Sequence, residues 1–250
     1  LSINTGGLKI SCLYSKPTEK IRFMNTIIKA LGIICLFLIT NQTIAQVFDE
    51  WDARPNVSLK YKFNKRLSVS GTYYLYLEEN FRQYNKSVLA TEIEYKFAPW
   101  LKAGIDYRFG IDQKDNYHDI RYSATFSYKA SSKWKFSYRP MLQQEFISLK
   151  KEHLQADPIE YYLRNRVTVS FKISNNWEVY AFTENYLRAG SGDLRFYRQK
   201  TATGAEVEAT ERSKFGARFE VIHKKNGKVV ARPNISYTLT LGYRKASAGN

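Results

Sequence analysis

The stretch LATEIEYKFAPWLKAGIDYRF, residues 89–109, decides the fold. Every second residue is apolar or aromatic, with Thr91 as the exception, in residues 89–97 and again in residues 101–109, and most of the residues between them are charged. A period of two puts the two sets on opposite faces of a β-strand. The Ala98-Pro99 pair between the two halves is a turn signal. The stretch therefore predicts an antiparallel hairpin with one apolar and one polar face.

The same alternation runs through almost the whole chain after residue 55. It recurs in residues 57–63, 67–77, 120–128, 134–138, 167–173, 177–181, 215–221 and 235–243. This makes about ten strands, near the roughly 9 to 11 residues that a tilted membrane strand needs. The sequence thus predicts an all-β protein.

The predicted links alternate between short and long. Tight turns are expected at residues 64–66, 98–99, 130–133, 174–176 and 225–227, and longer polar links at residues 78–86, 110–117, 148–158 and 189–213. Outer-membrane barrels have short periplasmic turns and longer outer loops. We therefore expect a transmembrane antiparallel up-and-down β-barrel of 10 to 12 strands, with residues 189–213 as its most accessible outer loop. A barrel of ten strands would have both ends outside, so residues 47–54 or 189–213 are expected to hold further strands.

Aromatic residues gather at both ends of the predicted strands. Near the short turns these are Phe63, Phe97, Trp100, Tyr128, Trp134 and Trp177, and toward the long links Tyr73, Tyr74, Tyr76, Phe109, Tyr161, Tyr162 and Tyr186. Membrane interfaces select such rings, because they combine an apolar body with a polar tip. Two belts favour a membrane barrel over a soluble β-sandwich, the alternative for alternating strands.

The stretch MNTIIKALGIICLFLITNQTIAQ, residues 24–46, has the build of a cleaved signal peptide. Its apolar core of about ten residues is too short for a membrane-spanning helix. We expect cleavage after Ala45, so that residues 24–45 are the leader, residues 46–250 form one barrel domain, and residues 1–23 are an over-extended start. Cys12 and Cys35 are the chain's two cysteines and precede the cut. The exported chain is therefore expected to lack disulfides.

The chain is strongly basic, with a formal net charge of +16 at pH 7. Residues 1–46 contain five basic residues and one acidic residue, so the remainder keeps 34 and 22, a balance of +12. In the cytosol such a charge, with many tyrosines, would favour nucleic-acid binding. Export argues against nucleic acid. The expected partners are outer-membrane lipids, lipopolysaccharide and small acidic solutes.

At this point the chain resembles the DUF2490 family. The resemblance rests on the leader that ends at Ala45-Gln46, on Trp51, and on three longer units: YKFNKRLSVSGTYY (61–74), YKFAPWLKAGIDYRF (95–109) and YYLRNRVTVSFKISNNWEVYAFTENY (161–186). It implies an outer-membrane barrel of a Gram-negative bacterium and no agreed activity. The ending, Tyr243-Arg244-Lys245 followed by ASAGN, departs from the terminal aromatic residue of many barrels.

If the apolar face meets lipid, the charged face lines the interior. The candidate lumen-lining residues are Arg108, Arg121, Arg139, Arg164, Arg166, Arg218, Glu92, Glu94, Glu178 and Glu184. Our first interpretation is a structural barrel whose Arg and Glu side chains pair and close the lumen. The alternative is a narrow anion-preferring porin for small acidic solutes or oligosaccharides, because arginine suits carboxylates.

A second alternative is a hydrolase that acts on lipid or peptide at the outer rim. His118 could work with Asp106, Asp115 or Asp119 on a nucleophile such as Ser123. Nothing in the spacing selects this group, and a histidine in a polar loop is usually solvated. The sequence therefore predicts no catalytic residues, no cofactor site and no metal site.

Overall fold

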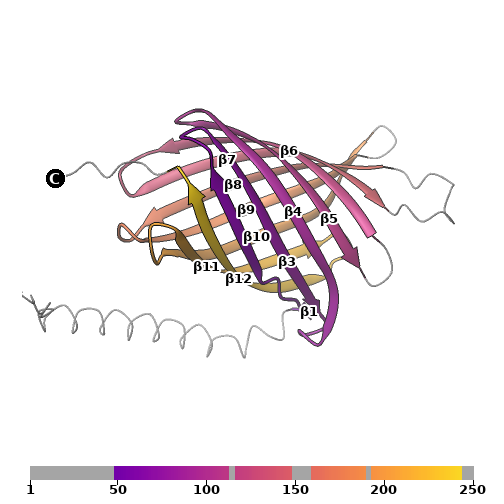
Figure 1. The fold of residues 1–250 in the computed structure, drawn as a ribbon. Coiled ribbons are helices and arrows are strands. Elements are labelled where there is room, and N and C mark those ends of the chain that lie inside the picture. The colour runs from indigo at the N-terminus through magenta and orange to yellow at the C-terminus, as the bar shows by residue number, and fades with distance from the viewer. Residues whose placement is uncertain (1–47, 113–115, 148–158, 190–192, 244–250) are drawn as a thin grey trace, which may run out of the picture. The chain divides into compact units, whose positions relative to one another are not determined.

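The computed structural model describes residues 48–112, 116–147, 159–189 and 193–243. They form one β-sheet that closes on itself (Figure 1). The strands are β1 (Glu50–Trp51), β2 (Asn56–Lys62), β3 (Leu67–Glu78), β4 (Gln83–Ala98), β5 (Leu101–Asp112), β6 (Asn116–Lys129), β7 (Trp134–Ile147), β8 (Glu160–Lys172), β9 (Trp177–Ala189), β10 (Leu194–Glu208), β11 (Ser213–Lys224) and β12 (Val229–Gly242). The described residues contain no helix of the length and apolarity that a membrane span requires.

Strands β2 to β12 make a closed barrel of eleven strands, within the predicted range of 10 to 12. Neighbours in sequence pair antiparallel, while β12 closes the barrel by pairing parallel with β2, from Ser236 opposite Asn56 to Gly242 opposite Lys62. An odd number of alternating strands leaves the first and last pointing the same way, so their contact must be parallel. The predicted antiparallel barrel therefore has one parallel seam. Bacterial outer-membrane barrels usually have an even number of strands.

The short strand β1 continues β2 along the same line. Asp52 donates its backbone N–H to Ala231 of β12, at 2.9 Å, and Ala53 forms an isolated bridge with Leu77 of β3. Pro55 lies between β1 and β2, and it has no N–H to give to a ladder. Residues 50–62 therefore fill one position in the wall, and the possible extra strand in residues 47–54 is an extension of the first strand.

Strand β10 occupies most of the link that we expected to be an outer loop, residues 189–213. Gly204, in the middle of this strand, pairs with Tyr180 and Arg218. The alternation does not predict β10 for two reasons. Its outward side chains are mostly Thr, Ala and Gln, and a bulge between Phe196 and Arg198 shifts the alternation by one residue. The hypothesis of a hidden strand in this link is thus correct, and the accessible loop is not there.

The links at the two ends of the barrel differ less in length than the sequence predicts. The end of the barrel with the predicted short turns, here called the turn rim, carries the links at residues 63–66, 99–100, 130–133, 173–176 and 209–212. The opposite rim carries those at residues 79–82 and 225–228. The predicted Asn-Gly turn thus forms, but at the opposite rim. The expected long links at residues 78–86 and 110–117 belong largely to strands, because β3, β4, β5 and β6 extend into them. Residues 148–158 lie outside the described residues.

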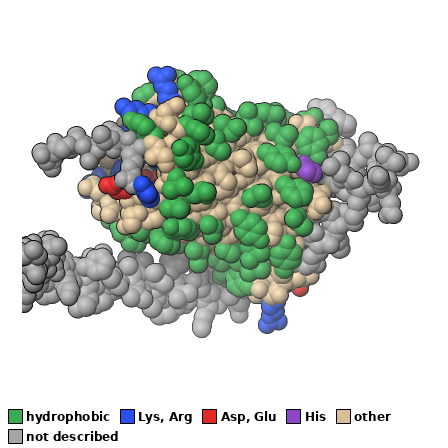
Figure 2. Space-filling view, in the orientation of Figure 1, with side chains coloured by type: hydrophobic (Ala, Val, Ile, Leu, Met, Phe, Trp, Pro, Cys, Tyr) green, Lys and Arg blue, Asp and Glu red, His purple; other side chains and the backbone are tan. Residues whose placement is uncertain are grey.

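The barrel is apolar outside and charged inside. Outward side chains such as Val57, Ile105 and Ile235 are 51% to 67% exposed, and hydrophobic atoms cover much of the face seen in Figure 2. Inward side chains such as Glu184 and Glu220 are 1% exposed. A soluble domain has the reverse arrangement, whereas a membrane barrel faces lipid with its apolar side chains.

The aromatic belts are only partly as predicted. All six residues expected near the short turns, from Phe63 to Trp177, are exposed on the barrel. Of those expected toward the long links, Tyr73 and Tyr161 are exposed, but four rings turn into the lumen: Tyr74, Tyr76, Tyr162 and Tyr186. Each of the four lies beside an outward residue, so the alternation places it on the inner face. The exposed rings toward the opposite rim are therefore partly other residues than expected, among them Phe81 and Tyr84.

A cationic cavity in the barrel lumen

The lumen contains a cavity of about 550 Å³. Among the described residues its wall includes twelve cationic side chains: Arg54, Lys86, Arg108, Arg121, Arg139, Arg164, Arg166, Arg198, Lys200, Arg218, Lys224 and Arg232. Six acidic side chains line it as well: Glu78, Glu92, Asp106, Asp119, Glu145 and Glu206. The wall also holds seven tyrosines: Tyr74, Tyr76, Tyr117, Tyr162, Tyr180, Tyr186 and Tyr197. The cavity is therefore polar, with cations in excess.

Glu184 of β9 organises the first cluster in the wall. Its carboxylate accepts hydrogen bonds from Arg164, at 2.8 Å to Nη2 and 3.2 Å to Nε, and from Arg166 Nη2 at 2.7 Å. The hydroxyl of Tyr186 donates a further bond at 3.1 Å. Gln143 accepts from Arg164 Nη1 at 2.9 Å. Because Glu184 is almost fully buried, these donors replace the water that its charge would otherwise need.

Glu220 of β11 has the same role in a second cluster. Its Oε1 lies 2.9 Å from Arg54 Nη2 and 2.8 Å from Arg218 Nε, and its Oε2 lies 3.6 Å from Lys200 Nζ. Nearby, Arg232 Nη2 donates to Asp52 at 2.6 Å. Asp52 and Arg54, just before β2, thus connect the start of the barrel to β12 and β11 inside the lumen.

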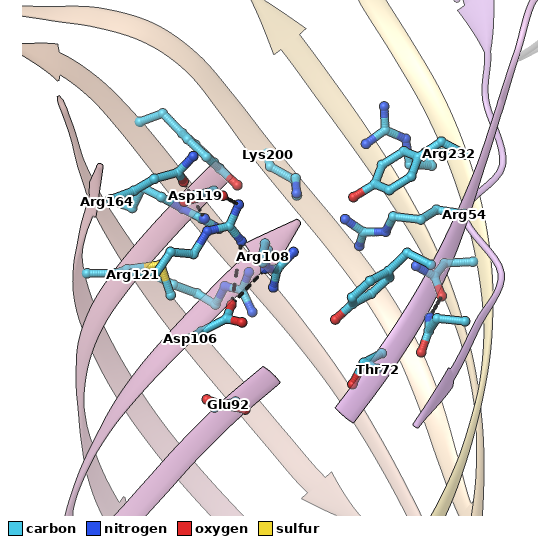
Figure 3. A pocket seen from close by; sticks show the side chains of 18 of the residues that line it. Arg54, Thr72, Glu92, Asp106, Arg108, Asp119, Arg121, Arg164, Lys200 and Arg232 are labelled. Carbon is cyan, nitrogen blue, oxygen red and sulfur yellow. Dashed lines mark hydrogen bonds and ion pairs between the residues drawn. The ribbon is translucent and has the colours of Figure 1, made fainter. Parts of the chain in front are cut away.

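A third cluster lies on β5 and β6. Arg108 Nε donates to Asp106 Oδ2 at 2.7 Å, and Arg121 pairs with Asp119 while its Nη1 lies 4.0 Å from Asp106 Oδ2. Figure 3 shows this group on one side of the open space and Arg54 with Arg232 on the other. The cavity therefore separates two walls that both present guanidinium groups.

Several guanidinium groups lie over aromatic rings of the lumen. Arg164 and Arg198 lie 4.3 and 4.1 Å from the ring centroid of Tyr186, and Arg108 lies 5.1 Å from that of Tyr74. Such contacts are attractive, since the ring face is electron-rich. They also hold the flexible arginine side chains in fixed positions around the cavity.

A different set of ion pairs lies toward the turn rim. Glu94 pairs with Lys102 at 3.1 Å and with Lys60 at 3.5 Å, and Lys135 pairs with Glu178 at 3.2 Å. These side chains are only partly buried, and they do not line the cavity. The lumen thus has an arginine zone around the cavity and a lysine-carboxylate zone next to the turn rim.

The ten candidate residues fall into three positions. The cavity wall holds seven of them: Arg108, Arg121, Arg139, Arg164, Arg166, Arg218 and Glu92. Glu184 lies buried beneath Arg164 and Arg166, while Glu94 and Glu178 belong to the lysine-carboxylate zone.

Sequence reasoning missed five charged residues of these clusters: Asp52, Arg54, Arg198, Lys200 and Arg232. Each lies in a stretch that we had left out of a strand, either before residue 57, in β10 or at the start of β12. If the alternation of residues 57–63 is continued toward the N-terminus, Asp52 and Arg54 fall on the inner face of the barrel. No comparable signal marks Arg198, because the bulge precedes it.

The candidate rim histidine does not join the lumen clusters. His118 Nδ1 is 2.6 Å from the hydroxyl of Tyr107, on the outer face, whereas Asp119 and Ser123 face the lumen. His153 and Asp115 lie outside the described residues. Within the part of the chain that the structure covers, no cluster of three His, Cys, Asp or Glu side chains is placed to hold a metal ion.

Comparison with solved structures finds chains that are similar at low sequence identity. A solved structure titled "Bacterial polysaccharide outer membrane secretin" is similar at 12% identity and a TM-score of 0.46, over 71% of this chain and 64% of the other, so the chain spans less than two thirds of it. A second, titled "NanC porin structure in rhombohedral crystal form.", is similar at 10% identity and a TM-score of 0.49, over 76% and 99%.

The comparison with curated proteins gave no match. A family model does match the sequence, over residues 55–231, and its description is "Protein of unknown function (DUF2490)". Since the matched residues make up more than half of the chain, the protein belongs to the DUF2490 family.

Proposed function

We propose that this protein is an outer-membrane β-barrel whose cationic lumen admits small acidic solutes. The observation that carries the proposal is the cavity of about 550 Å³, with twelve cationic and six acidic side chains in its wall. Charged groups of one sign around a narrow space concentrate solutes of the opposite sign. Rings of arginine and lysine are the usual means of anion selection in pores.

The outer face supports a place in a membrane. Exposed apolar side chains cover the wall, and aromatic rings such as Phe97, Trp100 and Tyr128 lie next to the turn rim. In water, an apolar surface of this extent would drive association. The turn rim would face the periplasm, as short turns do in such barrels. The predicted leader and the family resemblance support export to the outer membrane of a Gram-negative bacterium.

The arrangement of the acidic groups supports a preference for anions. Glu184 and Glu220 are each surrounded by two or three cations, so their negative charge is neutralised within the wall. The guanidinium groups of Arg139 and Arg198 line the same cavity without an ion pair to any carboxylate of the described residues. A solute in the cavity would therefore meet a positive field.

A closed structural lumen is the second candidate, and the lysine-carboxylate zone favours it. The pairs of Glu94 with Lys60 and Lys102, and of Lys135 with Glu178, lie between the cavity and the turn rim. If they fill the lumen there, the barrel holds a cavity but no passage. The hydrolase hypothesis gains no support, because the nearest hydrogen-bond partner of His118 is Tyr107 on the outer face.

Electrical recording separates these candidates. The protein is purified in detergent from membranes of cells that express the full chain, and inserted into a planar bilayer under a gradient of KCl. We expect discrete channels whose reversal potential shows a preference for chloride over potassium. The variant Arg139→Gln should reduce that preference, whereas Arg195→Gln, at an exposed site 3.7 Å from Asp193, should leave it unchanged. A correctly folded barrel without current would favour the closed lumen.

A further inference from the structure

The cavity's charges point to a particular class of ligand. We infer that the cavity binds a small polyanion, a molecule with two or more separate carboxylate or phosphate groups, through Arg139 and Arg198. The inference rests on the proposed function, because it names the class of acidic solute that the lumen would take.

The charge balance of the cavity gives the ligand's charge. Against the twelve cations in its wall stand ten carboxylates of the described residues: the six that line it, and Glu50, Asp52, Glu184 and Glu220, which pair with its cations. Two positive charges remain. A monovalent anion leaves half of this excess unneutralised, whereas a ligand with two negative charges matches it.

The unpaired groups show where the ligand would bind. Among the described residues, neither Arg139 nor Arg198 makes an ion pair or a hydrogen bond with a carboxylate. The guanidinium of Arg198 is held 4.1 Å from the ring centroid of Tyr186, so it is positioned before any ligand arrives. An arginine that is oriented but has no acceptor is suited to bidentate binding of an oxyanion.

The size and the lining of the cavity restrict the ligand further. About 550 Å³ is within the usual range of small-molecule sites, roughly 300 to 1,000 Å³. Guanidinium groups lie over the rings of Tyr74 and Tyr186, so these rings are not free to stack on an apolar ligand. Arg139 on β7 and Arg198 on β10 are three strands apart, roughly 14 Å along the wall. A ligand that contacts both therefore needs anionic groups that are separated from one another.

Calorimetric titration of the purified protein at low salt tests the inference. The probes are citrate for polycarboxylates, tripolyphosphate for polyphosphates, and acetate for a single charge. We expect saturable binding of citrate or tripolyphosphate at least about tenfold tighter than that of acetate, since each added charged contact contributes about that factor. Citrate without tripolyphosphate would identify a carboxylate site, and the reverse a phosphate site.

Matched variants localise the binding. Arg139→Gln and Arg198→Gln should each weaken binding of the preferred probe about tenfold. Arg195→Gln removes the same charge from strand β10 at an exposed position, and it should have no effect. A mobility in gel electrophoresis that changes on boiling, in every variant as in the unmodified protein, would show that the variants are folded.

Two results would overturn the inference. One is equal affinity for citrate, tripolyphosphate and acetate, and the other is an equal loss of binding in Arg195→Gln, which would indicate unspecific attraction to a basic protein. Anion-selective channels together with either result would leave the proposed function in place. Saturable polyanion binding to a barrel that passes no current would support the site and refute transport.

Discussion

Neutralising Glu184 is the sharpest test of the lumen's architecture. Glu184→Gln keeps the size of the side chain and one carbonyl oxygen, but it replaces the other oxygen by an NH₂ group. That group cannot accept the hydrogen bonds that Arg166 and Tyr186 now donate at 2.7 and 3.1 Å. The two guanidinium groups of Arg164 and Arg166 then face each other without the buried charge that separates them.

The expected loss of unfolding free energy follows from these contacts. A hydrogen bond to a charged group contributes about 1.5 to 3 kcal/mol, and breaking a buried ion pair by removal of one partner costs about 3 to 5 kcal/mol. We expect Glu184→Gln to lower the stability by about 3 to 5 kcal/mol, near the upper value because a second cation is also left unpaired.

Unfolding by denaturant in lipid vesicles, followed by tryptophan fluorescence, measures this loss. Glu208→Gln is the matched control: the same change at a side chain that is 58% exposed and 3.9 Å from Lys214, where we expect less than about 1 kcal/mol. The double variant Glu184→Gln, Arg166→Gln should be less damaged than the sum of its single changes, because the two charges depend on each other. A loss for Glu184→Gln that equals that of the control would refute this account of the wall.

Three further predictions concern packing, membrane depth and the lumen tyrosines. Gly204→Ala should cost about 1 to 3 kcal/mol of unfolding free energy, because its Cβ would lie 2.7 Å from the ring of Tyr180 and 2.8 Å from a backbone oxygen. Gly71→Ala is the control: a Cβ there would have no atom within 4 Å, so the change should be neutral or slightly stabilising. Ile105→Arg, on the outer face midway along β5, should cost about 2 to 4 kcal/mol in bilayers, and Tyr128→Arg, next to the turn rim, about 0 to 1 kcal/mol; equal costs would refute the membrane placement. Tyr186→Phe should lower the stability by about 1.5 to 3 kcal/mol through loss of its hydrogen bond to the Glu184 carboxylate. The binding of anions should change little, since the ring still supports Arg164 and Arg198.

The alternation of the sequence predicts the barrel wall because each strand has lipid on one side and the lumen on the other. Its apolar and polar side chains must therefore alternate along the strand. Residues 89–109 show this most clearly: they form β4 and β5 as an antiparallel hairpin, with Ile93 and Ile105 opposite each other on the outer face. The prediction fails where that contrast fades. In β10 the outward Thr201 and Thr203 are polar enough to resemble a loop, although they occupy the same wall.

The lumen is harder to predict, because its contacts join residues that are distant in sequence. The alternation along β8 is enough to place Arg164 and Arg166 on the inner face. The sequence does not show that Glu184 lies between them, because this depends on the register of β8 and β9. The pair of Arg54 with Glu220 depends on closure of the whole barrel. Such pairs can be inferred only once strand order, shear and register are known.

The parallel seam between β12 and β2 limits the ways in which this barrel can have evolved. A chain that gains or loses strands as complete hairpins changes their number by two, so it remains even or remains odd. Eleven strands therefore cannot be reached from an even-numbered ancestor by hairpins alone. From such an ancestor a single strand would have to be gained or lost, and one end of the chain would then move to the other side of the membrane. The strand that is interrupted at Pro55, made of the short β1 and the longer β2, is where we would look for the trace of such an event.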